Sequence, residues 1–108
     1  MKYRVRLVAE AEEDLLRIVT YIAANDSAEA AERVLAGIER ALTALETLPE
    51  RGHLPPELER IAVRGFREVH FKPYRVIYEI SDRDVLVHAV LDGRRDMTTL
   101  LERRMTRA

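Results

Sequence analysis

The stretch from residue 67 to residue 96 constrains the fold most strongly, because it contains consecutive extended segments joined by very short connections. Residues 74–80 and 85–91 each show a period-two alternation, which is typical of strands. The polar residues 81–84 between them predict a hairpin turn. Residues 66–71 form a third extended run, and Lys72 and Pro73 reverse the chain after it. Because such short connections join antiparallel neighbours, we predict a three-stranded meander.

The alternation divides this meander into two faces. We expect one face to pack on helices through Tyr74, Val76, Tyr78, Ile80, Val85, Val87, Ala89 and Leu91. The opposite face then carries Arg75, Ile77, Glu79, Leu86, His88 and Val90. A solvated sheet face is usually polar, so the aliphatic residues there indicate a cover, either the C-terminal helix or a bound partner.

The first half of the chain predicts one strand and two helices. Residues 3–8 alternate, and their basic neighbours share one face as expected for an edge strand: Lys2, Arg4 and Arg6. Apolar residues then recur at helical spacing over residues 11–22 and 31–45. Residues 26–29 have capping-box spacing and predict the start of the second helix. The very short link predicts an antiparallel helical hairpin.

The remaining segments complete the predicted domain. Proline and glycine residues predict a loop over residues 48–61, with a short helical turn at 57–61. Asp96 is placed to cap a C-terminal helix with an apolar side of Met97, Leu100, Leu101 and Met105. We therefore predict one α+β domain over residues 1–108. Its N-terminal strand and antiparallel helical hairpin pack on a three- to four-stranded antiparallel sheet, followed by the short C-terminal helix.

Composition excludes several classes of protein. The chain has no cysteine, which excludes disulfides and thiolate metal sites. No run approaches the roughly 18 apolar residues of a membrane span, and the N-terminus is unlike a signal peptide, so we expect a cytoplasmic protein without a membrane partner. The net charge is -1, but residues 1–60 (8 basic, 12 acidic) carry -4 and residues 61–108 (10 basic, 7 acidic) carry +3. Only the C-terminal half therefore suits an acidic partner.

Four motifs follow one another at specific spacings. They are Ala11-x-x-Asp14-Leu15-x-x-Ile18-x-x-Tyr21-Ile22, Pro49-x-x-Gly52, Arg67 with Tyr74-Arg75-Val76-Ile77-Tyr78, and Gly93-Arg94-Arg95-Asp96. In this order the chain resembles the ParE branch of the RelE/ParE toxin superfamily over nearly its whole length. The resemblance implies a cofactor-free toxin of a type II toxin–antitoxin pair. ParE-type members poison DNA gyrase, whereas RelE-type members cleave messenger RNA on the ribosome.

The resemblance also implies target-binding candidates: Arg67, Arg75, Arg94 and Arg95. Arg75 matches the catalytic strand arginine of RelE-type toxins, and Arg94 or Arg95 matches their arginine after the last strand. Six residues beyond, RelE-type toxins have a tyrosine, whereas this chain has Leu100 or Leu101. RNA cleavage needs a proton donor and acceptor. We therefore expect a non-enzymatic gyrase inhibitor without catalytic residues. A RelE-type endoribonuclease and a non-toxic member that binds only its antitoxin are the alternatives.

The implied partners are DNA gyrase and a cognate antitoxin. The antitoxin is expected to be a small ribbon-helix-helix type protein. Its C-terminal arm is expected to fold onto the toxin and give a hetero-oligomer. Antitoxin-binding candidates are residues of the meander's opposite face: Arg75, Ile77, Leu86 and Val90. Simpler interpretations stay open. Arg75 and Glu79 can be a solvated pair, and residues 94–96 can be only a charged helix start.

The histidines are the remaining reactive candidates. His53, His70 and His88 are separated by 17 and 18 residues, which match no compact metal motif, so we interpret them as ordinary strand or surface histidines and expect no metal site. As a replacement for the missing acid or base, the sequence offers only Glu68, His70, Glu79 and His88.

Overall fold

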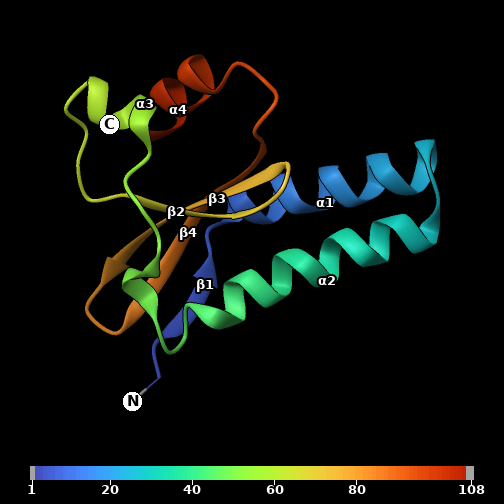
Figure 1. The fold of residues 1–108 in the computed structure, drawn as a ribbon, viewed down its shortest axis with the longest axis horizontal. Coiled ribbons are helices and arrows are strands. Elements are labelled where there is room, and N and C mark those ends of the chain that lie inside the picture. Colours follow the sequence, from blue (N-terminus) through green and yellow to red (C-terminus); the bar gives the residue numbers. More distant parts are fainter. Residues whose placement is uncertain (1, 107–108) are drawn as a thin grey trace.

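The computed structural model describes residues 2–106, which fold into a sheet with helices on both faces (Figure 1). In chain order the elements are β1 (Arg4–Leu7), α1 (Ala9–Asn25), α2 (Ala28–Ala44), the 3-10 turn η1 (Pro49–Arg51), α3 (Pro56–Arg60), β2 (Arg67–Phe71), β3 (Tyr74–Ser81), β4 (Asp84–Asp92) and α4 (Met97–Thr106). Helices α1 and α2 form a long hairpin that extends beyond the sheet, and α3 and α4 lie side by side away from it. The predicted α+β architecture is confirmed.

The sheet has the strand order β1-β4-β3-β2. Strands β2, β3 and β4 form the predicted antiparallel meander. Strand β1 is an edge strand, as predicted, and pairs in parallel with β4 from Arg4 opposite Asp84 to Leu7 opposite Val87. The sheet is therefore mixed rather than wholly antiparallel as predicted, because the α1–α2 hairpin and the meander together bring β4 beside β1 in the same direction.

Polar side chains begin two of the helices. Ser27 is the N-cap of α2, where its Oγ accepts a hydrogen bond from the Ala30 N–H at 3.0 Å. Before α4, Asp96 accepts from the Thr99 N–H at 3.2 Å and from its hydroxyl at 2.8 Å, which confirms the predicted cap.

Within residues 2–106, no helix is both long enough and apolar enough to cross a membrane.

An irregularity in β4 changes which side chains share a face. Ile77 pairs with Ala89 and Tyr78 pairs with Val87, so His88 is an extra residue without a partner on β3. Such a bulge inverts the alternation of the residues that follow it. The sequence-based assignment is therefore correct for Val87 but wrong after it. Ala89 and Leu91 lie on the sheet face away from the helical hairpin, and Val90 lies on the face that the hairpin covers.

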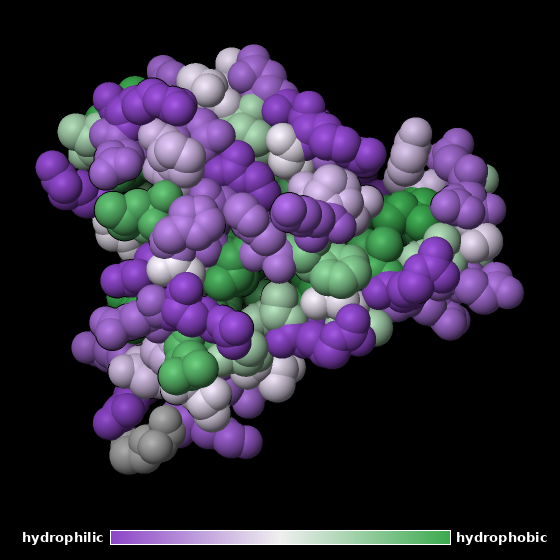
Figure 2. Space-filling view, viewed as in Figure 1, coloured by the Kyte–Doolittle hydropathy of each residue, from purple (hydrophilic) through white to green (hydrophobic). Residues whose placement is uncertain are grey.

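Two apolar cores result, one on each face of the sheet. On the hairpin face, α1 and α2 cover the strand residues Tyr74, Val76, Tyr78, Val85, Val87 and Val90. On the α3/α4 face, the core consists of Leu58, Ile77, Ala89, Leu91, Met97 and Leu101. Of the three aliphatic residues that indicated a cover, Ile77, Leu86 and Val90, only Ile77 lies in this core, where the C-terminal helix and α3 cover it. Polar residues occupy most of the surface in Figure 2, and apolar ones gather over the sheet and between the hairpin helices.

Candidate functional site

Arg75 of β3 is held by two carboxylates on the α3/α4 face. Its Nε and Nη2 donate to Glu68 Oε1 and Oε2 at 2.6 and 2.9 Å, and its Nη1 and Nη2 donate to Glu57 Oε2 and Oε1 at 2.8 and 2.7 Å. The Glu68 side chain is only 1% exposed, and that of Arg75 is 14% exposed. The hydrogen bond from Arg75 lowers the pKa of Glu57, and the hydrogen bonds that Arg75 donates to Glu57 and then to Glu68 raise the pKa of Arg75. Arg75 therefore stays charged and fastens α3 to the sheet.

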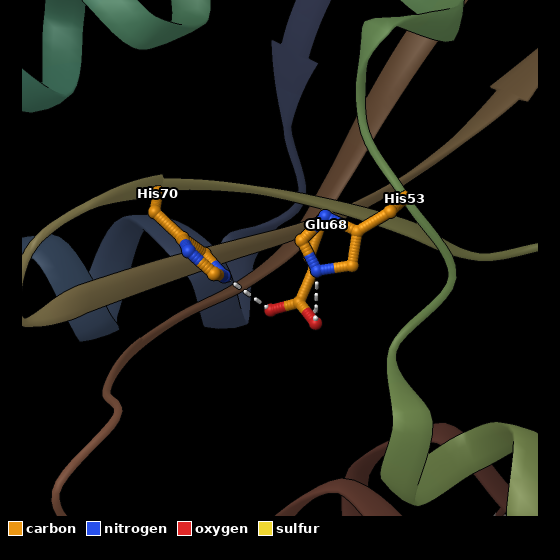
Figure 3. A group of neighbouring side chains, drawn as sticks. All are labelled: His53, Glu68 and His70. Carbon is orange, nitrogen blue, oxygen red and sulfur yellow. Dashed lines mark hydrogen bonds and ion pairs between the residues drawn. The ribbon is translucent and has the colours of Figure 1, made fainter.

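Two imidazoles flank the carboxylate of Glu68. His70 Nε2 lies 2.9 Å from Glu68 Oε1, and His53 Nε2 lies 3.2 Å from Oε2 (Figure 3). The backbones of His53 and Glu68 exchange two hydrogen bonds, of 3.1 and 2.8 Å, so the two residues are cross-strand neighbours. The structure thus brings together two histidines that the sequence keeps 17 residues apart. The spacing of Glu68 and His70, which places both on one strand face, was the only local signal.

The second sequence motif, from Pro49 to Gly52, is fixed by Tyr78 and Arg67. The Tyr78 hydroxyl donates to the Pro49 carbonyl at 2.7 Å and accepts from the Gly52 N–H at 3.0 Å. Arg67 Nη1 donates to the carbonyls of Gly52 and Glu50 at 2.9 and 3.2 Å. A Cβ at residue 52 would stand 2.5 Å from the Tyr78 hydroxyl, so only glycine fits. Tyr78 lies in the core beneath the helical hairpin, as predicted for this strand face, and Arg67 holds this loop.

The junction between β4 and α4 carries the other two candidate arginines. The Gly93 N–H donates to the Pro73 carbonyl at 2.8 Å, and a Cβ at residue 93 would lie 2.9 Å from Arg75 Cδ. The junction therefore packs on the stem of Arg75. Arg94 is exposed and pairs with Asp92 at 2.7 Å. Arg95 is also exposed, and its side chain has no ion pair or hydrogen bond among residues 2–106.

A second ion pair ties the two helical layers together through the bulge. Asp14 of α1 is buried and accepts from the Val90 N–H at 3.0 Å. Arg104 of α4 donates to both Asp14 oxygens, at 3.1 and 3.0 Å, and to the His88 carbonyl at 2.9 Å. The β1–β4 pairing ends at Val87, so these side chains bond the backbone groups of β4 just beyond it. This contact explains Asp14 in the first motif, whereas sequence reasoning missed Arg104 and Glu57.

The antitoxin-binding candidates do not share an exposed face. Ile77 is fully buried beneath α3 and α4, and Val90 is 1% exposed beneath the helical hairpin. The expectation that both project from the sheet face away from the helical hairpin is correct for Ile77, which α3 and α4 cover, but wrong for Val90, because the bulge inverts its position. Leu86 is half-buried, and Arg75 is occupied by carboxylates. The role of these residues toward an antitoxin stays a prediction.

The residues proposed as substitutes for a catalytic acid or base form separate pairs. His88 Nε2 lies 2.8 Å from Glu79 Oε1, and the His88 ring meets Phe66 edge-on. Glu68 and His70 form the other pair, beside Arg75. At the positions matching the RelE-type tyrosine, Leu101 is fully buried in the α3/α4 core and Leu100 packs against it.

Known proteins resemble this chain in sequence and fold. The family described as "ParE toxin of type II toxin-antitoxin system, parDE" matches residues 5–97. Toxin ParE3 of Caulobacter vibrioides is 28% identical over 88 residues, which are 82% of this chain and 84% of that protein.

Two solved structures share the fold. A chromosomal ParDE toxin–antitoxin system from P. aeruginosa aligns with a TM-score of 0.67 at 16% identity, over 82% of this chain and 92% of the matched chain. The toxin–antitoxin complex RelBE2 from Mycobacterium tuberculosis aligns with a TM-score of 0.57 at 26% identity, over 83% and 96%. The profile match covers most of the sequence, and the chain therefore belongs to the ParE toxin family of type II toxin–antitoxin systems.

Proposed function

We propose that this toxin inhibits DNA gyrase by binding, without a chemical step of its own, and that a cognate antitoxin neutralises it. The observation that carries the proposal is the state of Arg75, the strand arginine that RelE-type nucleases use. Its four hydrogen bonds to Glu57 and Glu68 occupy four of the five N–H donors of its guanidinium. A phosphate would have to displace these carboxylates, so Arg75 supports the fold rather than RNA cleavage.

The chain also lacks the proton-transferring tyrosine of RelE-type nucleases. Cleavage through a ribose 2′-hydroxyl needs a proton acceptor and a proton donor, and the loss of one typically costs about 10²–10⁴-fold in rate. Leu101 and Leu100 stand where a tyrosine would transfer the proton, and both belong to an apolar core. Arg94 and Arg95 remain at the surface, but an arginine stays protonated and transfers no proton. They suit recognition of an acidic surface.

A supercoiling assay tests the proposed target. We expect the purified toxin to inhibit gyrase supercoiling or to trap its cleaved-DNA complex, and the double variant Arg94→Ala/Arg95→Ala to weaken inhibition about tenfold, because arginines are enriched among interface hot spots. The control Arg33→Ala/Arg64→Ala removes the same charge at two other exposed positions and should inhibit like the wild type. If the folded wild-type toxin fails to inhibit supercoiling at high excess, gyrase is excluded as the target.

The antitoxin partner is proposed from the same family. The matched structures are described as a ParDE system and a RelBE2 complex. We propose that the antitoxin is a small ribbon-helix-helix type protein whose C-terminal arm wraps the toxin in a hetero-oligomer, with Leu86 the half-buried candidate contact. Expression of the toxin alone should slow growth, and co-expression of the small protein encoded beside it should restore growth. Normal growth with soluble toxin would instead favour the non-toxic member.

An RNase remains the second candidate because the structure contains two carboxylate–imidazole pairs, Glu68 with His70 and Glu79 with His88. The Glu79–His88 pair, at 2.8 Å, is the one not tied to Arg75. We expect no codon-positioned messenger cleavage in a translation extract at toxin concentrations that inhibit gyrase. Cleavage by the wild type that disappears in His88→Ala/Glu79→Gln would establish a nuclease with a rearranged site.

A further inference from the structure

Three potential metal ligands converge at the edge of β2. One ligand atom each from His53, Glu68 and His70 lie within 4.8 Å of one another. Figure 3 shows why: His70 follows Glu68 on the same strand face, and His53 comes from the neighbouring loop, so the two rings lie next to each other and each points at one oxygen of the same carboxylate. The two rings lie 5.2 Å apart between centroids and meet edge-on. Cross-strand pairing, rather than a local motif, builds this cluster.

We propose that these three residues bind a single transition-metal dication of the zinc class. Two imidazoles and one carboxylate form the ligand set of several catalytic zinc sites and of facial-triad iron sites. With Zn–N bonds of about 2.0–2.1 Å, ligand atoms of a tetrahedral site lie roughly 3.3 Å apart. The two imidazole-to-carboxylate distances are already 2.9 and 3.2 Å. All three ligand atoms lie within 4.8 Å of one another, so the two imidazole nitrogens would have to approach each other when the metal binds.

The carboxylates bonded to Arg75 leave a net negative charge beside the proposed ligands. With neutral imidazoles, Glu57 and Glu68 carry two negative charges against the one positive charge of Arg75, whereas Arg40 and Arg51 also line the groove. Arg75 uses two of the roughly four acceptor positions of Glu68, so acceptor capacity remains toward the histidines. Hydrogen bonds to a ligating carboxylate also orient it, which is the support that metal sites obtain from the residues behind their ligands.

The proposed site is open on one side. The three ligands line a surface groove of about 450 Å³. Its other walls include residues of α2, among them Arg40, and Arg51 of η1. Three protein ligands leave at least one position on a tetrahedral metal for water or an exogenous ligand. Because the two basic residues Arg40 and Arg51 line the same groove, this open position suits water or a small anion.

The opposing explanation is that both imidazoles only donate hydrogen bonds to Glu68. Hydrogen bonding requires a proton on each Nε2, whereas metal binding requires a lone pair there and the proton on Nδ1. The two explanations differ in measurable metal affinity. The side chains of His53 and His70 are 60% and 37% exposed, so either can be replaced with little damage to the core.

Titration of the untagged, metal-free chain with Zn²⁺ in a calorimeter tests the proposal. We expect one Zn²⁺ per chain, a rise in Tm on zinc addition, and visible d–d absorption when Co²⁺ is used instead. Loss of a residue that only hydrogen-bonds a metal ligand typically lowers metal affinity by about 10- to 100-fold. His53→Gln and His70→Gln each remove a ligand itself and should lower the Zn²⁺ affinity by at least as much. His88→Gln is the matched control, because His88 also contacts one carboxylate but lies in a pair, and should leave affinity unchanged.

Circular dichroism of each variant separates loss of a ligand from loss of folding. The absence of saturable binding near one equivalent in the folded wild type would overturn the proposal. So would unchanged affinity in folded His53→Gln and His70→Gln, or an equal loss in His88→Gln, which would mean that zinc binds elsewhere. None of these readouts depends on gyrase inhibition, so the metal site stands or fails separately from the proposed function.

Discussion

The two faces of the sheet are stabilised in different ways. On the hairpin face, the buried strand residues are apolar and pack against apolar stripes of α1 and α2. On the α3/α4 face, an apolar core lies beside a charged cluster in which Arg75 joins Glu68 of β2 to Glu57 of α3. An apolar core tolerates substitutions that conserve its volume, whereas a buried charge requires its partners. Substitutions on the two faces should therefore have different signatures.

The largest effect is expected at the charged cluster. Arg75→Ala leaves the buried Glu68 carboxylate without a cation and should destabilise the fold by about 3–5 kcal/mol. Because the cost is that of an uncompensated charge, the double variant Arg75→Met/Glu68→Leu should recover most of it. Urea unfolding of both variants measures the difference. A double variant that is as unstable as Arg75→Ala would show that packing, not charge, dominates this face.

The hairpin face up to Val87 was the part that the sequence could predict. Tyr74, Val76 and Val87 follow a strict alternation, and α2 carries its apolar stripe at helical spacing, so local patterns place them correctly. The α3/α4 face depends on features without a local signature. A bulge at His88 inverts the end of β4, and Glu57 and Arg104 find their partners through tertiary packing. For the same reason the His53–His70 proximity was not foreseen.

An intermediate effect is expected where the two layers meet. Asp14→Ala removes the acceptor of the buried Val90 N–H and of the partly buried Arg104 guanidinium, and should cost about 1–3 kcal/mol. The control Arg17→Ala removes the exposed neighbour of Asp14, at 3.6 Å, and should change stability by less than about 1 kcal/mol. A double-mutant cycle of Asp14→Ala with Arg104→Met measures the coupling. No coupling would mean that α4 is held by Leu101 and its apolar neighbours alone.

The smallest effect, which is visible mainly as a pH dependence, is expected at Glu57. Its pKa is lowered, first by the hydrogen bond from Arg75, so its ionised form stabilises the fold above the ordinary carboxyl value of 4.5. This contribution is lost as the pH falls through the lowered pKa of the folded state, because protonation then weakens the pairing with Arg75. Glu57→Gln keeps the shape and should cost about 1 kcal/mol or less at pH 7, as expected for a partly exposed pair. Urea midpoints from pH 7 to pH 3 should therefore fall less steeply for the variant than for the wild type. Midpoint curves that run parallel would show that Glu57 contributes no charge to the cluster, and that Glu68 alone balances Arg75.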